Sequence, residues 1–237
     1  MVFVLIVGVL IISDNLFSRL PPAHAQAADI TTGLVAYWKF DEGSGTTAAD
    51  SSGNNNTGTL TNGPTWTAGK VNSAVSLNGT NQYVALGSDL MASGDRTACA
   101  WAYLAAPMAN ISWQSIFNSV YFTVQYFFAN GTYSLEVTSD NNHLVSYSLP
   151  SSPVGVWNHI YVVRPGGPGL NATLYVNGVN VAADSDGDPN TAFNLDIGGN
   201  TNNPIYFNGK IDEVRVYNRL LTDQEIKRLY NMGHTGS

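Results

Sequence analysis

The 237-residue sequence contains few charged residues and a single cysteine. Asp, Glu, Lys and Arg together make up 11% of the chain, compared with about 25% in a typical globular domain. There are 10 Lys and Arg against 17 Asp and Glu, which gives a formal net charge of −7. Nucleic acids and anionic membranes are bound largely through Lys and Arg, so this composition disfavours both as partners. Because one cysteine cannot form an intramolecular disulfide, stability must come from a buried core or a bound metal.

Residues that favour strands and turns are abundant in this chain, in which charged residues are few. Val, Ile, Tyr, Thr and Phe alternate with clusters of Gly and Asn. Asn130-Gly131 and Asn177-Gly178 each suit a two-residue hairpin turn, because both turn residues must tolerate a positive φ. Short strand patterns recur between residues 33 and 218 with no alternating helices. We therefore expect one all-β domain over residues 33–233, an antiparallel two-sheet sandwich of the jelly-roll type.

A helix pattern is convincing only near the C-terminal end. Thr222 and Glu225 have the spacing of a capping box, and Gly233 follows as a stop signal. Ile226 and Leu229 would share one apolar face. The sequence thus predicts one short amphipathic helix docked on the β body.

The N-terminal residues resemble a secretory signal peptide. Residues 1–12 are apolar, and Ala23-His24-Ala25 provides a small-residue cleavage pattern. The apolar run is shorter than the roughly 20 residues that a membrane-spanning helix needs. No Lys or Arg precedes it, so an upstream start codon or an uncleaved anchor is an alternative. We expect a signal peptide over 1–25, a short linker over 26–32, and a mature chain without a membrane span that is secreted, displayed at the cell surface or periplasmic.

Several conspicuous side chains fit a structural role. Trp38, Trp101 and Trp157 fall within or beside apolar strand patterns, so we expect them to pack in the core. Cys99 lies in a stretch that alternates Ala with bulky residues, and a small buried hydrophobe is the better interpretation than a nucleophile. His159 lies beside Trp157, and we interpret it as a structural residue as well.

An ordered series of motifs resembles the bacterial laminin-G-like jelly rolls of the concanavalin A-like lectin/glucanase superfamily. The series comprises GLVAYWKFDEGSG (33–45), DSSGN (50–54), NGTNQYV (78–84), VWNH (156–159), LYVNG (174–178) and FNGKIDEVRVYNR (207–219). The resemblance implies a concanavalin A-like sandwich. It does not assign a function, because this fold hosts sugar binding, adhesion and hydrolysis alike.

The resemblance also implies a structural calcium ion where the first loop meets the last strand. The positions that carry this expectation are Asp41, Ser44, Thr47, Asp50 and Asp212. Ca²⁺ prefers oxygen ligands from carboxylates and main-chain carbonyls, and the loop between Asp41 and Asp50 can supply both. Alternatively, Asp41 and Asp50 form Asx turns, and Asp212 pairs with Arg215 or Arg219.

A second acidic segment, DSDGDPN at 184–190, has a superficial likeness to an EF-hand loop. That loop requires Gly at its sixth position and Glu at its twelfth, but Pro189 and Leu195 stand there. We interpret the segment as a surface turn, in which any bound ion would be held weakly because the bidentate carboxylate is missing.

A candidate ligand site combines aromatic and amide side chains. Trp113 lies in a polar connecting stretch, where an exposed indole would offer a flat apolar face to a sugar ring. Three consecutive aromatic residues at 126–128 require a strand there to point at least one ring away from the core. Amide groups nearby could orient a ligand through hydrogen bonds. The candidate residues are Trp113, Gln125, Tyr126, Phe128, Asn142 and Asn202. The alternative is a mixture of core and ordinary surface residues.

The sequence offers no catalytic arrangement. The glucanase members of the superfamily carry an acid-x-acid-x-x-acid pattern on one strand, which does not occur here. Glu136 and Asp140 would share a strand face about 13 Å apart, too far for retaining hydrolysis. We therefore expect an exported, non-catalytic, calcium-stabilised module that binds carbohydrate or another extracellular surface ligand. The alternatives are an adhesion or structural domain with a protein partner, and a divergent glycoside hydrolase or polysaccharide lyase.

Overall fold

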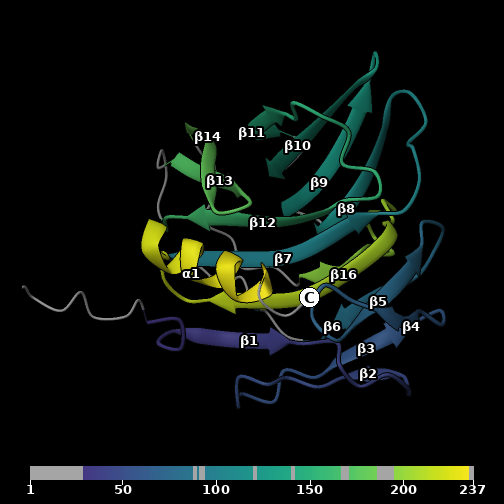
Figure 1. Cartoon of the computed structure of the whole chain (residues 1–237), viewed down its shortest axis with the longest axis vertical. Coiled ribbons are helices and arrows are strands. Elements are labelled where there is room, and N and C mark those ends of the chain that lie inside the picture. The colour runs from purple at the N-terminus through teal and green to yellow at the C-terminus, as the bar shows by residue number, and fades with distance from the viewer. Residues whose placement is uncertain are drawn as a thin grey trace, which may run out of the picture.

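The computed structural model describes residues 29–87, 90, 94–119, 122–139, 142–166, 171–185 and 195–234. Two antiparallel sheets, here sheet A and sheet B, stack face to face, and one helix, α1 (Asp223–His234), lies outside them (Figure 1). The predicted all-β sandwich with a single C-terminal helix is confirmed. Within the described residues no helix is long and apolar enough to cross a membrane.

The two sheets each draw strands from distant parts of the chain. Sheet A has the order β14 (Val179–Ser185), β13 (Asn171–Val176), β12 (Trp157–Arg164), β7 (Arg96–Leu104), β16 (Asn208–Tyr217), β5 (Ser73–Asn78) and β4 (Thr65–Ala68), and β1 (Leu34–Trp38) also pairs with β16. Sheet B has the order β11 (Asn142–Ser148), β10 (Thr132–Ser139), β9 (Phe122–Ala129), β8 (Ser112–Asn118), β15 (Asp196–Ile197), β6 (Tyr83–Leu86), β3 (Gly58–Thr61) and β2 (Thr47–Ala48).

The main core lies between the sheets and takes alternate residues from each strand. On β7, Ala98 and Ala100 belong to this core, whereas Cys99 between them belongs to a separate cluster on the outside of sheet A. On β9, Val124 and Tyr126 belong to the main core. Side chains at the intervening positions therefore project to the outer face of their sheet, as the two-residue period of a strand requires.

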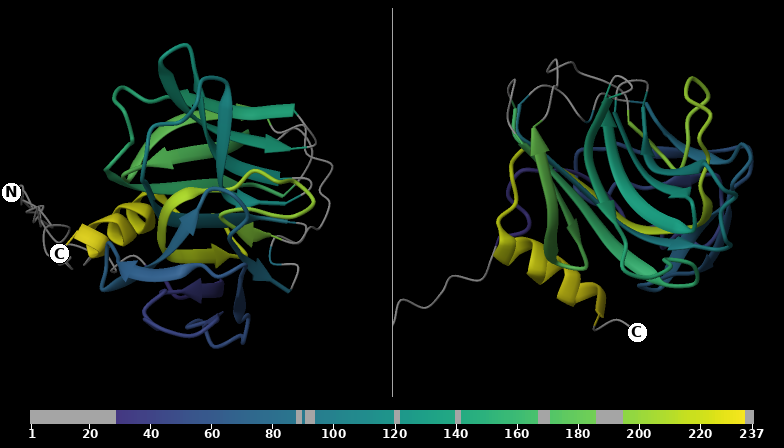
Figure 2. Two further views of the ribbon diagram at one scale, coloured as in Figure 1. Left: turned by 90° about the vertical axis from the view of Figure 1, so that its right-hand side faces the viewer. Right: turned by 90° about the horizontal axis from the view of Figure 1, so that it is seen from above.

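Helix α1 covers the outer face of sheet A, beside β12 and away from β8 to β10 (Figure 2). The apolar cluster beneath it consists of Cys99, Tyr161, Val163, Tyr175, Tyr217, Leu221, Ile226 and Leu229. Trp101 is buried on the same side, where its ring stacks on His159 at 4.5 Å and on Tyr230 at 5.7 Å. Trp38 and Trp101 are both buried as predicted, Trp38 between the sheets and Trp101 under the helix, whereas Trp157 is only half-buried.

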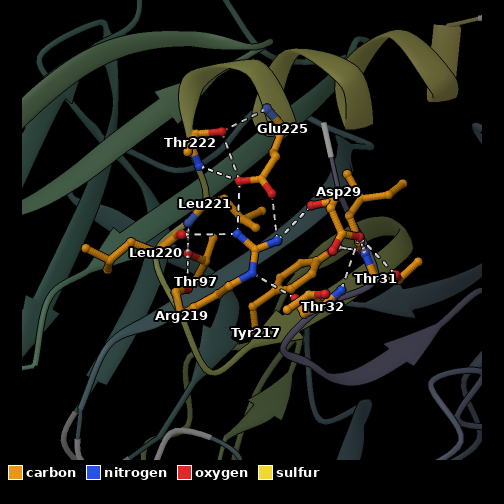
Figure 3. A network of polar contacts seen from close by, with 11 residues as sticks. Asp29, Thr31, Thr32, Thr97, Tyr217, Arg219, Leu220, Leu221, Thr222 and Glu225 are labelled. Carbon is orange, nitrogen blue, oxygen red and sulfur yellow. Dashed lines mark hydrogen bonds and ion pairs between the residues drawn. The ribbon is translucent and has the colours of Figure 1, made fainter. Parts of the chain in front are cut away.

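Arg219 joins three parts of the chain (Figure 3). Its guanidinium donates to the carbonyl oxygens of Asp29 and Thr32 at 2.7 Å each, and to both carboxylate oxygens of Glu225 at 2.7 and 2.9 Å. The carboxylate also accepts hydrogen bonds from the N–H and the hydroxyl of Thr222, so the predicted capping box is present. The last residues of the expected linker, 29–32, are therefore fixed against the helix.

Candidate functional site

The outer face of sheet B presents three rows of side chains across β8, β9 and β10. Directly paired residues of antiparallel strands project to the same face, so the strand registers define the rows. The rows are Trp113, Phe127 and Ser134; Ser115, Gln125 and Glu136; and Asn118, Thr123 and Thr138. Because the alternating residues Val124 and Tyr126 point into the core, these nine residues project away from it, and we call them the sheet B face. Ser115, Asn118, Thr123, Gln125 and Glu136 are nevertheless no more than 4% exposed.

Trp113 forms the aromatic end of the sheet B face. Its indole is stacked on Phe127 with ring centroids 5.0 Å apart and an interplanar angle of 21°. The residue is 40% exposed. Beside it lies a groove of about 660 Å³, whose lining includes Thr80, Ile111, Trp113, Gln114, Ile205 and Tyr206. An aromatic surface is thus held in place by a second ring and remains open to a ligand.

The rim of this groove contains a strained residue that the sequence reasoning missed. Ile111 has a φ of 56° and is 63% exposed. A β-branched residue rarely adopts a positive φ, and such strain costs on the order of 1–3 kcal/mol. The turn is held by the hydroxyl of Ser112, which donates to the carbonyl of Ala109, and by Asn110, which accepts from the N–H of Asn130. An isolated apolar residue in a polar loop was the signal that could have identified Ile111.

Two amide oxygens of the sheet B face have no hydrogen-bond donor. They are Oε1 of Gln125 and Oδ1 of Asn118, both buried. The amide nitrogens are engaged: Nε2 of Gln125 lies 3.4 Å from the Glu136 carboxylate, and Nδ2 of Asn118 donates to the carbonyls of Asn203 and Ile205 at 3.0 and 3.2 Å. A buried oxygen without a donor costs about 1–3 kcal/mol. Because both oxygens are fully covered, a ligand hydroxyl would supply the missing donor only after the groups that cover them move aside.

The predicted ligand residues of β8 and β9 are only partly on this face. Trp113 and Gln125 lie on it, as described above. Tyr126 is fully buried in the core, with its ring 6.3 Å from that of Phe207, so it does not lie on the sheet B face. Phe128 projects to the same side as Tyr126 and packs against the core. The outward aromatic residue of this strand is Phe127, because it alternates with those two.

The remaining predicted ligand residues are elsewhere. Asn202 is exposed, and its N–H donates to the side chain of Asn200 at 2.7 Å. Its neighbour Asn203 is the residue that approaches the face, with Nδ2 3.5 Å from Oγ1 of Thr123. Asn142 belongs to β11, and its side chain lies outside the described part of the structure. So do residues 186–190 of the acidic segment and Asp140, the acid considered as a partner of Glu136.

Asp50 does not resemble a free metal ligand. Its Oδ1 accepts hydrogen bonds from the N–H groups of Tyr37 and Ser52, and its Oδ2 from the N–H of Asn56 and the hydroxyl of Ser52, all at 2.8–2.9 Å. Burial raises the pKa of Asp50, but these bonds outweigh burial and hold the pKa below its usual value. All four acceptor positions are occupied, which is the turn-forming role considered as the alternative.

Asp41 and Asp212 approach a different segment, the turn at residues 69–73. Asp41 accepts from the Asn72 side chain and the Ser73 N–H, and Asp212 accepts through Oδ2 from the N–H groups of residues 70 and 71 at 2.8 and 2.9 Å. The second oxygen of Asp212 is buried without a partner. Burial raises the pKa of this carboxyl to about 7. The pairing of Asp212 with an arginine is not formed, because Arg215 contacts Glu213 at 2.6 Å.

The five residues expected to bind calcium are therefore divided between two places. Ser44 is exposed in the loop that follows Asp41, and Thr47 is exposed at the start of β2. In the part of the chain that the structure describes, no three Asp, Glu, His or Cys side chains are grouped closely enough to hold a metal ion. A calcium ion fits the arrangement only at the 69–73 turn, where an unpartnered buried oxygen of Asp212 lies beside the segment that Asp41 also contacts.

Comparisons with known proteins agree with the fold. The model of the concanavalin A-like lectin/glucanases superfamily matches residues 78–227. A comparison with curated protein sequences finds no significant match. Among solved structures, domain 4 of AbnA, an extracellular GH43 arabinanase from Geobacillus stearothermophilus solved in complex with arabinotriose, has a TM-score of 0.64. It is 23% identical over 83% of this chain and 98% of that domain.

Toxin binding domains share the same fold. The binding domain of botulinum neurotoxin DC, solved in complex with SialylT, has a TM-score of 0.64 at 12% identity over 86% of this chain. The binding domain of Paraclostridial Mosquitocidal Protein 1 has a TM-score of 0.64 at 16% identity over 86% of this chain. This chain spans 52% and 53% of those two domains respectively. At these identities the likeness shows the fold alone.

Proposed function

Since the chain belongs to the concanavalin A-like lectin/glucanases superfamily, we propose that it is a non-catalytic module that binds carbohydrate on the sheet B face. The observation that carries the proposal is that an exposed aromatic ring and a fixed polar group lie side by side on that face. Exposed Trp113, stacked on Phe127, lies next to the row that holds Gln125 with its unpartnered amide oxygen. A sugar ring binds by laying an apolar face on an aromatic ring while its hydroxyls bond to fixed polar groups. The sheet B face supplies both.

The carboxylates on this face support a non-catalytic role. Glu136 is the one acid among its nine residues. Glycoside hydrolysis uses two carboxyl groups that flank the bond to be cleaved. A single carboxylate, hydrogen-bonded to Gln125, suits ligand orientation better than bond cleavage.

Export belongs to the same proposal. The signal-like residues 1–25 would direct the chain out of the cytoplasm, where polysaccharides are available as ligands. The arabinanase that contains the similar domain 4 is itself extracellular. Sequencing of the exported protein tests this step: an N-terminus near residue 26 supports cleavage, and an intact Met1 contradicts it.

The binding site is tested by affinity electrophoresis of the full chain through gels that contain arabinan, xylan or β-glucan, each with Ca²⁺ and with chelator. We expect retardation by at least one polysaccharide. Trp113→Ala should weaken that binding about tenfold or more, because a central aromatic contact typically contributes about 2 kcal/mol. Val179→Ala, at an exposed apolar residue of sheet A, is the matched control and should bind normally. Retardation that Trp113→Ala leaves unchanged would place the ligand elsewhere.

A structural calcium ion remains part of the proposal, with fewer side-chain ligands than expected from the sequence. Asp41, Asp212 and main-chain carbonyls of residues 69–73 would hold it. The support is the buried, unpartnered oxygen of Asp212. A bound cation would provide this oxygen with a partner and strengthen the contact between the first loop and β16.

Thermal unfolding with and without Ca²⁺ tests the ion. A ligand that binds only the folded state raises the melting temperature, so millimolar Ca²⁺ should stabilise the chain relative to chelated protein. Asp212→Asn should lose this response. Asp50→Asn should retain it, although the variant is less stable, because the Asp50 oxygens are already occupied. Equal melting temperatures of the unaltered chain with Ca²⁺ and with chelator contradict a calcium site.

A further inference from the structure

We propose that the glycan bound by the sheet B face is uncharged, a neutral polysaccharide rather than one that carries carboxylate or sulfate groups. The inference rests on the proposed function of that face and adds the chemical class of the ligand. Two independent observations support it. One is where the chain places its cations, and the other is which hydrogen-bonding atoms the face presents.

Every Lys and Arg that the structure describes lies outside sheet B. These residues are Lys39, Lys70, Arg96, Arg164, Lys210, Arg215, Arg219, Lys227 and Arg228. They belong to strands of sheet A, to turns that adjoin those strands, or to α1. The eight strands of sheet B contain none, and neither do the residues that line the groove beside Trp113. An acidic sugar on the sheet B face would therefore find no cation among these strands and groove residues.

The cations of sheet A do not reach the outward side of sheet B. Arg164 lies 5.7 Å from the ring of Phe122 on β9, but Phe122 belongs to the main core, on the inward side of that strand. Lys70 lies 5.1 Å from the ring of Trp101, and Lys210 lies 5.2 Å from the ring of Tyr103. Both rings project from β7 on the side of sheet A that faces away from the main core, because the alternating alanines of β7 occupy that core. Packed sheets are about 10 Å apart, which is already close to the screening length of about 8 Å at physiological salt. These charges therefore act on the opposite side of the sandwich.

The unpartnered polar atoms of the sheet B face are hydrogen-bond acceptors. The unpartnered atoms are amide oxygens, on Gln125 and Asn118. Their amide nitrogens already donate within the protein, that of Gln125 to the carboxylate of Glu136. The hydroxyls of a neutral sugar can donate to such oxygens, whereas a carboxylate or sulfate group offers only acceptors. An acidic sugar would also meet the Glu136 carboxylate and a chain of net charge −7.

Matched polymers test the inference without knowledge of the natural ligand. Hydroxyethyl-cellulose and carboxymethyl-cellulose share a backbone and differ in charge, as do carboxyl-reduced and native polygalacturonate. The full chain is run through each by affinity electrophoresis at about 0.15 M salt, where long-range repulsion is screened, alongside the neutral polysaccharides named above. We expect association with neutral polymers and at least tenfold weaker association with their acidic counterparts.

A charge introduced on the face provides a second readout. Ser134 pairs with Phe127 in the same row as Trp113, so Ser134→Lys places a cation beside the proposed ligand. The variant should bind the acidic polymers about fivefold more strongly than the unaltered chain, the effect of one exposed ion pair. Thr65→Lys adds the same charge to an exposed residue of β4 in sheet A and should leave binding unchanged.

The outcomes separate this inference from the proposed function. Binding to acidic polymers as strong as to neutral ones, and abolished by Trp113→Ala, would overturn the inference and leave the proposed function intact. No retardation by any polymer, neutral or acidic, would overturn the proposed function and the inference with it. Equal responses of Ser134→Lys and Thr65→Lys would also contradict the inference, because the charge would then act through the whole protein rather than through the face.

Discussion

Replacing Arg219 with alanine should destabilise the fold by about 3 kcal/mol, because this side chain connects the N-terminal segment to α1. Two bonds are lost to the carbonyl oxygens of Asp29 and Thr32, at about 1 kcal/mol each. The ion pair with Glu225 contributes the rest. The side chains of that pair are 25% and 8% exposed, so solvent screening reduces its value below that of a fully buried pair. Glu225 also keeps its bonds from Thr222, which limits the cost of losing the arginine.

Urea unfolding followed by tryptophan fluorescence measures this loss, and thermal unfolding should show a decrease of about 6–12 °C for a chain of this size. Arg219→Lys should recover only part of the stability, because an ammonium group cannot reproduce the planar, five-donor geometry of the guanidinium. Lys227→Ala removes a charge from an exposed position of α1 and should change stability by less than about 0.5 kcal/mol. If Arg219→Ala and Lys227→Ala are equally stable, the reasoning about this junction is wrong.

Three further predictions concern burial, packing and pH. Burial raises the pKa of the Cys99 thiol to about 12, so a thiol reagent at pH 8 should label the chain in urea but not in its absence, and rapid native labelling would contradict this. A Cβ on Gly233 would approach the Trp101 indole to 2.5 Å, so Gly233→Ala should cost about 1–3 kcal/mol in urea unfolding; an unchanged midpoint would refute the close contact. Burial raises the pKa values of Asp50 and Glu225, but hydrogen bonds outweigh it and hold both below their usual range. Their contribution to stability is present above about pH 4 and lost as pH falls through the lower folded values, so Asp50→Asn should reduce the difference in urea midpoint between pH 7 and pH 3.

The sequence predicted the sandwich because its two-residue alternation and its hairpin turns are local signals, but alternation cannot state which side faces the core. In β7 the alanines face the other sheet, and Cys99 and Trp101 face outward. This orientation is stable only because α1, far along the chain, covers them. The same ambiguity explains why the sequence analysis chose Tyr126 and Phe128 for the candidate site, although Phe127 is the residue that faces outward. Alternation alone does not state which of three adjacent aromatic residues point away from the core.

The acidic residues show a second limit of sequence reasoning. Spacing brought Asp41 and Asp50 together in one loop, but the role of each depends on distant backbone groups. Asp50 is occupied by N–H groups of β1 and its own turn, whereas Asp212 approaches the turn at 69–73 across more than 130 residues of sequence. Hydrogen bonds between residues so far apart in the sequence depend on the topology of the fold. Short sequence patterns do not show which distant segments become neighbours.

The position of β16 has a consequence for how the molecule is made. This last strand lies in the interior of sheet A, paired with β7 on one side and with β5 and β1 on the other. A chain that ends before residue 208 lacks the strand that joins these two halves, so folding cannot be completed on a partial chain during synthesis. Contacts between such distant residues also form slowly. The position of β16 delays completion of the fold until residues 208–217 are available, which would suit the proposed export of the chain in an unfolded state.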